Sequence, residues 1–179
     1  LVPGSRLEGH ELVGDLLRHP SFPAESLVEV KRQSLSSIEQ ERKEPQAVVS
    51  NALARLGNPY PRGDVRYTRT FDEIVEDVNG VTLEQVREHH RRFYGASRGE
   101  FGAVGDMDVA AVRQALQVAF RDWTSGEPFT RIPQPLVPVP AQRLIFTTPD
   151  KQNATMRVEL PLPLSDNDTD YAALTMANY

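Results

Sequence analysis

The sequence contains no cysteine among its 179 residues. This absence excludes disulfides, thiolate zinc sites and a cysteine nucleophile, but it leaves the cellular compartment open. No apolar run approaches the roughly 20 residues of a membrane-spanning helix, so we expect no such span. Positive charge is also in short supply. A net charge of −5 provides no basic surface for phosphate groups, and nucleic acid is therefore not an expected partner.

Proline, in contrast, is abundant and unevenly placed. Eight of the 14 prolines fall between residues 128 and 163: Pro128, Pro133, Pro135, Pro138, Pro140, Pro149, Pro161 and Pro163. Each proline removes a backbone donor and favours extended geometry in the residue before it, so residues 126–141 are predicted to form a polyproline-type connector. The predicted boundaries are 1–125 for one domain portion, 126–141 for the connector and 142–179 for the start of a following domain.

The spacing of apolar residues and the positions of proline and glycine predict the secondary structure on either side of the connector. Apolar residues recur at helical spacing in several segments that end at proline or glycine. The helices are expected at 11–19, 22–38, 45–56, 71–78, 82–94, 108–123 and 168–179, with a loop at 58–70. Alternating apolar residues predict strands at 100–104, 143–148 and 154–160. A chain that starts without methionine and ends within a helix is expected to be part of a longer protein.

The four histidines, His10, His19, His89 and His90, do not form a zinc motif. Neither HExxH nor the inverted HxxEH occurs, and adjacent helical residues such as His89 and His90 point about 100° apart. Cationic side chains that complement a helix C-terminus are the favoured interpretation of the pair. His90 lies on the apolar face of its helix, where a hydrogen-bonded core histidine is favoured over a metal ligand.

Other candidate motifs also favour structural roles. Serines 34, 36 and 37 lie within a predicted helix, without the strand-to-turn elbow of a nucleophile. Gly99, Gly102 and Gly105 lack phosphate-loop spacing, and the tripeptide at 62–64 is too short to be informative. The 58–70 loop contains Tyr60, Arg62, Arg66, Tyr67 and Arg69. A solvated loop is favoured there over a contact with an anion or a peptide, although both remain open.

The order of segments along the chain resembles a known family. The segments are HPSFPAESLVEVKRQSLSSIEQERKEPQAV, ALARLGNPYPRGDVRYTRTFDEI and GVTLEQVREHHRRFYGASRGEFGAVGDMDVAAV, followed by FRDW and, after the connector, FTTPDKQNATMRVELPLPLSDNDTDYAALTMANY. In this order they resemble the pitrilysin/insulinase family of zinc metallopeptidases, or inverzincins. The resemblance covers about residues 11–179 and is greatest to bacterial members with two such units in one chain.

The resemblance places the family's zinc site in doubt for this chain. Family members bind zinc through HxxEH and a later glutamate, which belongs to a pair of glutamates spaced by seven on one helix. The HxxEH would lie before residue 1. Aligning Lys31 and Arg32 with the family's Glu-Arg pair puts the ligand position at Ile38 and its helper position at Lys31. Neither carries a carboxylate, and Glu39 would be rotated about 100° around the helix. No catalytic, cofactor-binding or metal-ligating residue is therefore assigned.

The family fold implied by the resemblance is α+β, with helices packed on a mainly antiparallel sheet. Most of its strands would precede residue 1, and residues 142–179 would begin the next homologous domain. The implied function is that of an inactive, peptidase-like unit of a zinc protease, which supplies chamber wall and substrate contact. Its expected partners are the active unit, in the same chain or another subunit, and a peptide or unfolded protein. Zinc would belong to the active unit, not to this chain.

Two alternatives remain. The chain could be the downstream part of an active zinc endopeptidase whose HxxEH lies upstream, or a non-enzymatic assembly subunit with the same fold. Bacterial members of the family are usually exported, so a periplasmic or cell-envelope location is expected, with the cytoplasm as the alternative. The sequence upstream of residue 1 would distinguish these possibilities.

Overall fold

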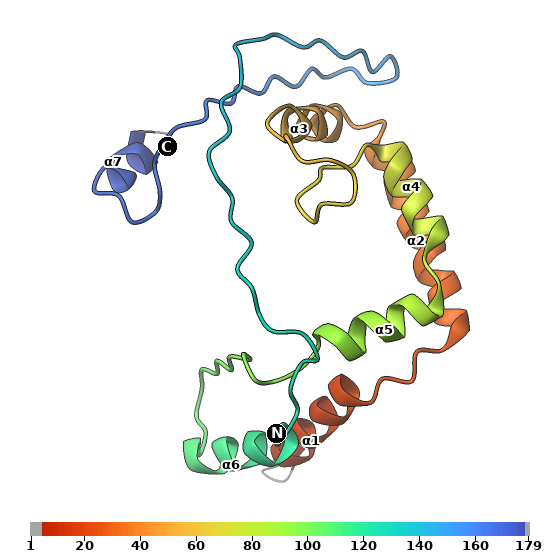
Figure 1. Ribbon diagram of the computed structural model, residues 1–179, viewed down its shortest axis with the longest axis vertical. Helices are drawn as coiled ribbons and strands as arrows, with labels where there is room; N and C mark the ends of the chain where they lie inside the picture. Colours follow the sequence, from red (N-terminus) through yellow and green to blue (C-terminus); the bar gives the residue numbers. More distant parts are fainter. Residues whose placement is uncertain (1–4, 178–179) are drawn as a thin grey trace. The chain divides into compact units, whose positions relative to one another are not determined.

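The computed structural model describes residues 5–177, with side-chain burial described from residue 12 onward. Within these residues it contains seven α-helices and no strand (Figure 1). The helices are α1 (Ser5–Arg18), α2 (Ala24–Glu41), α3 (Pro45–Leu56), α4 (Phe71–Gly80), α5 (Leu83–Phe93), α6 (Val109–Ala119) and α7 (Tyr171–Ala177). The helices predicted from the sequence are confirmed in place and type. The last two residues of the predicted 168–179 helix lie outside the described residues.

Helix boundaries follow from the local sequence. Thr82 and Gln85 form a capping box at the start of α5: Gln85 N donates to Thr82 Oγ1 (3.2 Å), and Thr82 N donates to Gln85 Oε1 (2.8 Å). Asp108 Oδ1 accepts from the backbone amides of Ala110 and Ala111 at the start of α6. This helix ends at Ala119, earlier than predicted, and Asp122 adopts a left-handed conformation (φ 57°) that no helix continues through.

The predicted α+β fold is wrong. Residues 100–104, 143–148 and 154–160 contain no strand, and the single isolated β-bridge among the described residues joins Arg62 and Asp64 in one loop. Alternating apolar residues favour extended backbone, but a strand forms only when a second strand completes its hydrogen bonds. In the described chain no segment supplies that ladder, so the helices pack without a sheet.

The described residues divide into two compact units. The first comprises Leu1–Lys31 and Gly80–Arg131, and the second comprises Arg32–Asn79 and Ile132–Tyr179. Helix α2 begins in the first unit and ends in the second. The three domain portions predicted from the sequence stay a prediction.

In the first unit, α1 packs against α6 through a glycine. Gly14 is buried, and a Cβ added to it would lie 2.9 Å from the Cβ of Ala119. Arg18 Nη1 also donates to the backbone oxygen of Ala119 (2.9 Å), which satisfies a carbonyl at the C-terminal end of α6. A larger side chain at position 14 would force the two helices apart.

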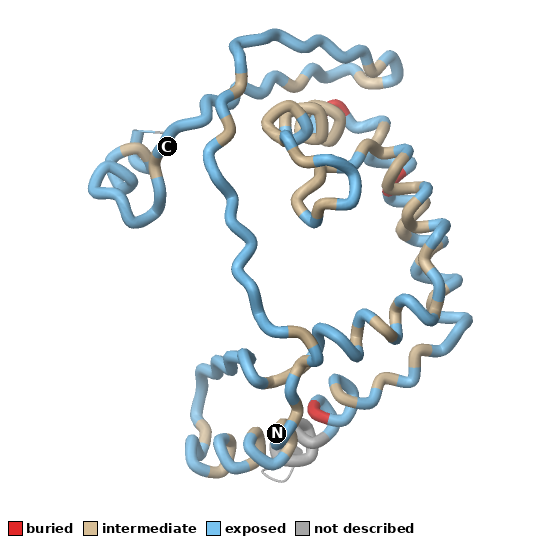
Figure 2. Tube along the Cα trace, viewed as in Figure 1, coloured by how far each residue is buried: buried red, intermediate tan, exposed pale blue. Residues whose placement is uncertain are grey.

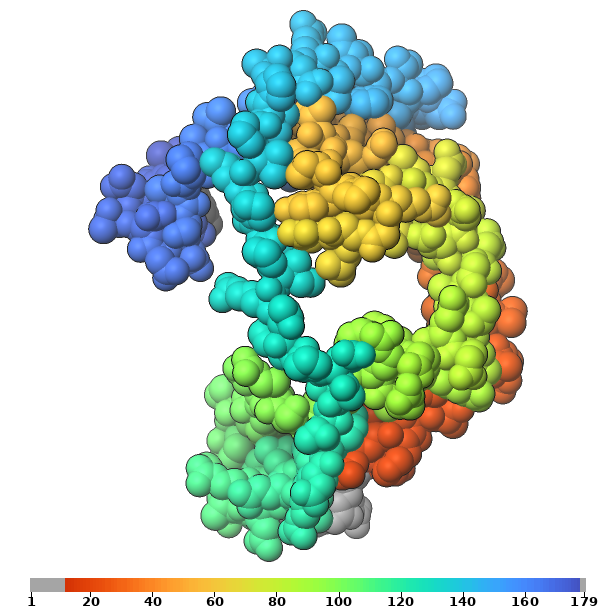
Figure 3. All heavy atoms as spheres, in the orientation of Figure 1, coloured from red at the N-terminus to blue at the C-terminus, as the bar shows by residue number. Residues whose placement is uncertain are grey.

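The second unit places α3 beneath two extended arms. We call residues 143–148 the first arm and residues 154–160 the second arm. Figure 3 shows this blue part of the chain against the orange α3. Phe146 of the first arm and Thr155 of the second line one cavity with Val48 and Val49 of α3. Among the residues described for burial, the buried apolar side chains are those of Ile38 and Pro45 (Figure 2).

Candidate functional site

Helix α2 carries the two positions at which the resemblance would place glutamates. Ile38 is 7% exposed, whereas Lys31 is half-buried and already engaged in an interaction. Seven residues make nearly two helical turns, so the two side chains lie on the same helix face. An apolar side chain packed at position 38 has no lone pair to offer a metal. The geometry therefore gives this helix face a packing role.

Glu39, which follows Ile38 in the sequence, takes part in an ion pair instead. Glu39 Oε1 lies 3.5 Å from Arg42 Nε, and its side chain is about half exposed. Arg42 also donates through Nη2 to Asp72 Oδ1 of α4 (2.7 Å). These contacts join the end of α2 to α4 within the second unit. Glu39 thus acts in a surface ion pair, as expected from its position one residue beyond the packed face.

The histidines are placed as packing residues. His90 Nε2 lies 2.8 Å from the backbone oxygen of Leu17, a carbonyl at the C-terminal end of α1. Its ring is 5.4 Å from the ring of Phe22, 4.8 Å from that of Tyr94 and 6.5 Å from that of Trp123. His90 therefore makes the predicted hydrogen bond, but it is half-buried and does not lie in a core as predicted.

The other described histidines, His19 and His89, make different contacts from that of His90 with Leu17. The ring of His89 packs on Phe93, 4.9 Å away, and His19 Nδ1 lies 3.0 Å from Asp15 Oδ1 on the surface. The side chain of His10 lies outside the described residues. No group of three His, Cys, Asp or Glu side chains that could hold a metal ion occurs in the part of the chain that the structure describes.

The 58–70 loop is an ordered network of ion pairs. Arg62 Nη2 lies 2.8 Å from Glu76 and 3.2 Å from Asp77, and Arg69 also donates to Asp77. The hydrogen bonds from these two arginines, with that of Arg69 the largest contribution, lower the pKa of Asp77. Since carboxylates of α4 already bind two of the three arginines, little positive charge remains for an anion.

The third arginine of this loop is held within it. Arg66 donates to Asp64 through Nε (3.0 Å) and Nη2 (2.8 Å), and these bonds lower the pKa of Asp64 to about 2. The guanidinium of Arg66 also lies 3.7 Å from the centre of the Tyr60 ring. Tyr67 donates to Glu73, and that hydrogen bond raises the pKa of the phenol. The loop is structured by its own charges and is exposed to solvent, as the 73% exposure of Val65 shows.

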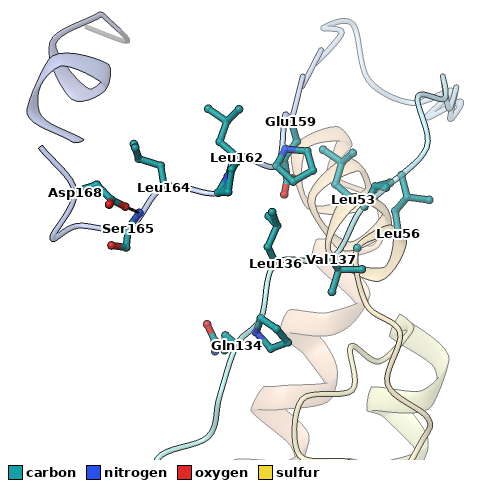
Figure 4. Close-up of a pocket in the computed structure, with 15 residues that line it drawn as sticks. Leu53, Leu56, Gln134, Leu136, Val137, Glu159, Leu162, Leu164, Ser165 and Asp168 are labelled. Carbon is teal, nitrogen blue, oxygen red and sulfur yellow. Dashed lines mark hydrogen bonds between the residues drawn. The ribbon is translucent and has the colours of Figure 1, made fainter. Parts of the chain in front are cut away.

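A cavity in the second unit is a candidate for contact with a ligand (Figure 4). It has a volume of about 550 Å³ and lies where α3 ends between two extended segments. Leu53 and Leu56 of α3 form one side, while Leu136 and Leu162 come from the two segments. Most of its lining side chains are apolar, three of them prolines, and Glu159 and Asp168 supply its carboxylates. It can bind apolar side chains, but it carries no arrangement of acid, base and nucleophile.

The face of α2 around Ile38 therefore offers a packing side chain, and the cavity at the end of α3 offers mostly apolar ones. The sequence profile described as "Peptidase M16 inactive domain" matches residues 80–179, which is 100 of the 179 residues. The chain belongs to the peptidase M16 family, the pitrilysin family, through its inactive domain. This confirms the family resemblance at that level.

The other comparisons add no relative. No curated protein and no solved structure matches the chain. None of the described helices combines the length and apolar character needed to cross a membrane.

Proposed function

We propose that this chain supplies chamber wall and substrate contact to a zinc protease while the zinc chemistry takes place in a partner unit. The observation that carries the proposal is the packing of Ile38 at the position where the family's ligand glutamate aligns. The match to the inactive domain of the family supports it. On this reading, helix α2 retains its packing role and has lost its role at a metal.

The contribution to catalysis is positional. An unfolded peptide would be held against the non-catalytic unit, and enclosure would exclude folded proteins by size. The cavity at the end of α3 is the candidate surface, because Leu136 and Leu162 can take up apolar side chains. The backbone of the extended segments beside it can offer carbonyl groups to the same peptide, although their prolines lack donors.

Reconstitution tests this role. The chain is combined with the HxxEH-bearing unit encoded in the same gene or a neighbouring one, and hydrolysis of carboxymethylated casein is followed. We expect this chain alone to be inactive and the combination to be more active than the HxxEH-bearing unit alone. Casein hydrolysis by the isolated chain, or no effect of the chain on its partner, would contradict the proposal.

A pair of variants tests the surface. Leu136→Asp places a charge in the cavity and should raise the KM for casein in the reconstituted pair while kcat changes little. Val65→Asp is the matched control, because Val65 is also exposed and lies in the 58–70 loop, away from the cavity lining. Equal effects of both variants would rule out a specific contribution of the cavity.

The proposal includes a periplasmic or cell-envelope location. The resemblance to exported bacterial members of the family supports this part. Fractionation of the source cells, with detection of the parent protein by antibody, tests it: recovery in the cytoplasmic fraction alone would contradict it.

A further inference from the structure

Residues 123–127, which follow α6 in the chain, lie on the C-terminal end of α5, and we call them the latch. A backbone hydrogen bond holds each end of the latch. At one end, Ala96 N donates to Trp123 O (2.8 Å). At the other end, Glu127 N donates to Arg92 O (2.9 Å). This second bond satisfies a carbonyl group in the last turn of α5, where no helical partner remains.

Two glycines allow the backbone of the latch to approach α5 this closely. A Cβ added to Gly95 would lie 2.2 Å from the backbone nitrogen of Ser125. A Cβ added to Gly126 would lie 3.4 Å from the backbone oxygens of Arg91 and Arg92. Backbone atoms cannot turn aside as the end of a flexible side chain can. Any residue larger than glycine at position 95 would therefore displace the latch.

The sequence sets both ends of the latch. Before it, the left-handed backbone of Asp122 (φ 57°) changes the direction of the chain after α6. After it, Pro128 has no N–H to donate and disfavours a helical conformation at Glu127. Within it, Ser125 Oγ donates to Glu127 O (2.8 Å) and closes a turn. The latch is therefore a short segment with its own boundaries and its own internal bond.

Side chains add little to the hold of the latch on α5. Arg92 and Glu127 form an ion pair (2.9 Å), but their side chains are 45% and 41% exposed, and water screens such a pair. None of the residues 123–127 is buried; they are half-buried or exposed. Segments held by few buried contacts open at a lower free energy than the helices beside them. The two backbone bonds and the close approach at Gly95 therefore determine whether the latch is closed.

We propose that the latch is a conformational device that closes on α5, and opens from it, as one unit, without unfolding of the helices. In the closed state, the start of the proline-rich connector is held on α5 as far as Glu127. In the open state, residues 123–127 are added to the freely moving part of the connector. The state of the latch thereby sets the reach of the connector, and Gly95 permits the closed state.

Hydrogen exchange of the 179-residue chain, followed by NMR, tests whether the latch opens as one unit. The amides of Ala96 and Glu127 donate the two bonds that close it, so they should have the same protection factor. This protection factor should exceed that of an unfolded peptide. It should also be smaller than the protection factors of amides in the middle of α6, since opening of the latch leaves that helix intact.

Three variants separate the close approach from the ion pair. Gly95→Ala should lower both protection factors by about tenfold or more, with the circular dichroism at 222 nm unchanged. Gly102→Ala is the matched control, because a Cβ at Gly102 meets no atom within 4 Å, and it should leave both protection factors unchanged. Arg92→Ala removes only the exposed ion pair and should lower them by less than about fivefold. Emission from Trp123, the only tryptophan, should shift to longer wavelength in Gly95→Ala alone.

The unchanged chain alone can overturn the proposal. Unequal or absent protection of the Ala96 and Glu127 amides would show that the two bonds break separately or are not formed. Protection equal to that in α6 would show that the latch opens only when the helices unfold. Among the variants, Gly95→Ala with both amides still protected, or with its helical signal lost, overturns the proposal equally. In the first case Gly95 does not control the closed state, and in the second the latch is not separable from the helices.

Discussion

The packing of Ile38 leads to a quantitative prediction. This side chain is 7% exposed, whereas Val28 on the same helix is 68% exposed. Complete burial of such a side chain contributes about 1.5–3 kcal/mol, and truncation to alanine leaves a cavity as well. Ile38→Ala should therefore lower the free energy of unfolding by about 2–4 kcal/mol. Val28→Ala, made where no packing is lost, should change it by about 0.5 kcal/mol or less.

Urea unfolding followed by circular dichroism at 222 nm measures both variants, with the midpoint compared at equal slope. Ile38→Glu extends the test, because a carboxylate at this buried position should cost at least as much as alanine. If Ile38→Ala is no more destabilising than Val28→Ala, Ile38 is not a packing residue. The assignment of this helix face to packing would then be refuted.

Three further perturbations test local features of the structure. Pairing with Arg66 lowers the pKa of Asp64 to about 2, below the value of about 3.9 in an unfolded chain. The stability that this pair contributes is therefore present above pH 4 and is lost as the pH falls toward 2. An NMR titration of the Asp64 carboxyl carbon should give a midpoint near 2. Thr82→Ala removes the capping box and should cost about 1 kcal/mol in urea unfolding, whereas Thr82→Ser should retain most of it. Gly14→Ala places a Cβ against Ala119 and should destabilise the first unit by about 1–3 kcal/mol, while Gly80→Ala, with open space around it, should be close to neutral in the same thermal melts.

The helices could be predicted from the sequence because their signals are local. A capping box at Thr82 and Gln85, a proline at the start of α3 and a glycine after it each act within a few residues of the boundary that they set. The early end of α6 was missed, because the left-handed conformation of Asp122 has no strong sequence signal. Its apolar residues Phe120 and Trp123 keep the helical period beyond the last helical turn.

The strands could not be predicted reliably because a strand depends on a distant partner. The alternation of residues 154–160 predicts an extended backbone, and the structure has no helix there. It does not indicate whether another segment completes the backbone hydrogen bonds. The α+β prediction failed at that step.

Some features of the candidate site could likewise be predicted from the sequence, and others could not. The absence of carboxylates at Lys31 and Ile38 could be read directly from the sequence, and the burial of Ile38 agrees with its place on an apolar helix face. The ion pairs of Arg62 and Arg69 with Asp77 join residues up to 15 positions apart, so their geometry depends on how α4 follows the loop. The alternation of arginine and aspartate within the loop could have indicated only the pair of Arg66 with Asp64.

Metal analysis tests the central claim most directly. The complete unit of the parent protein that contains α2 is purified, incubated with zinc and dialysed, and its zinc content is measured beside its hydrolysis of carboxymethylated casein. We predict that the unit retains no stoichiometric zinc and cleaves no casein unless the HxxEH-bearing unit is added. One tightly bound zinc per chain together with casein hydrolysis by this unit alone would contradict a non-catalytic role.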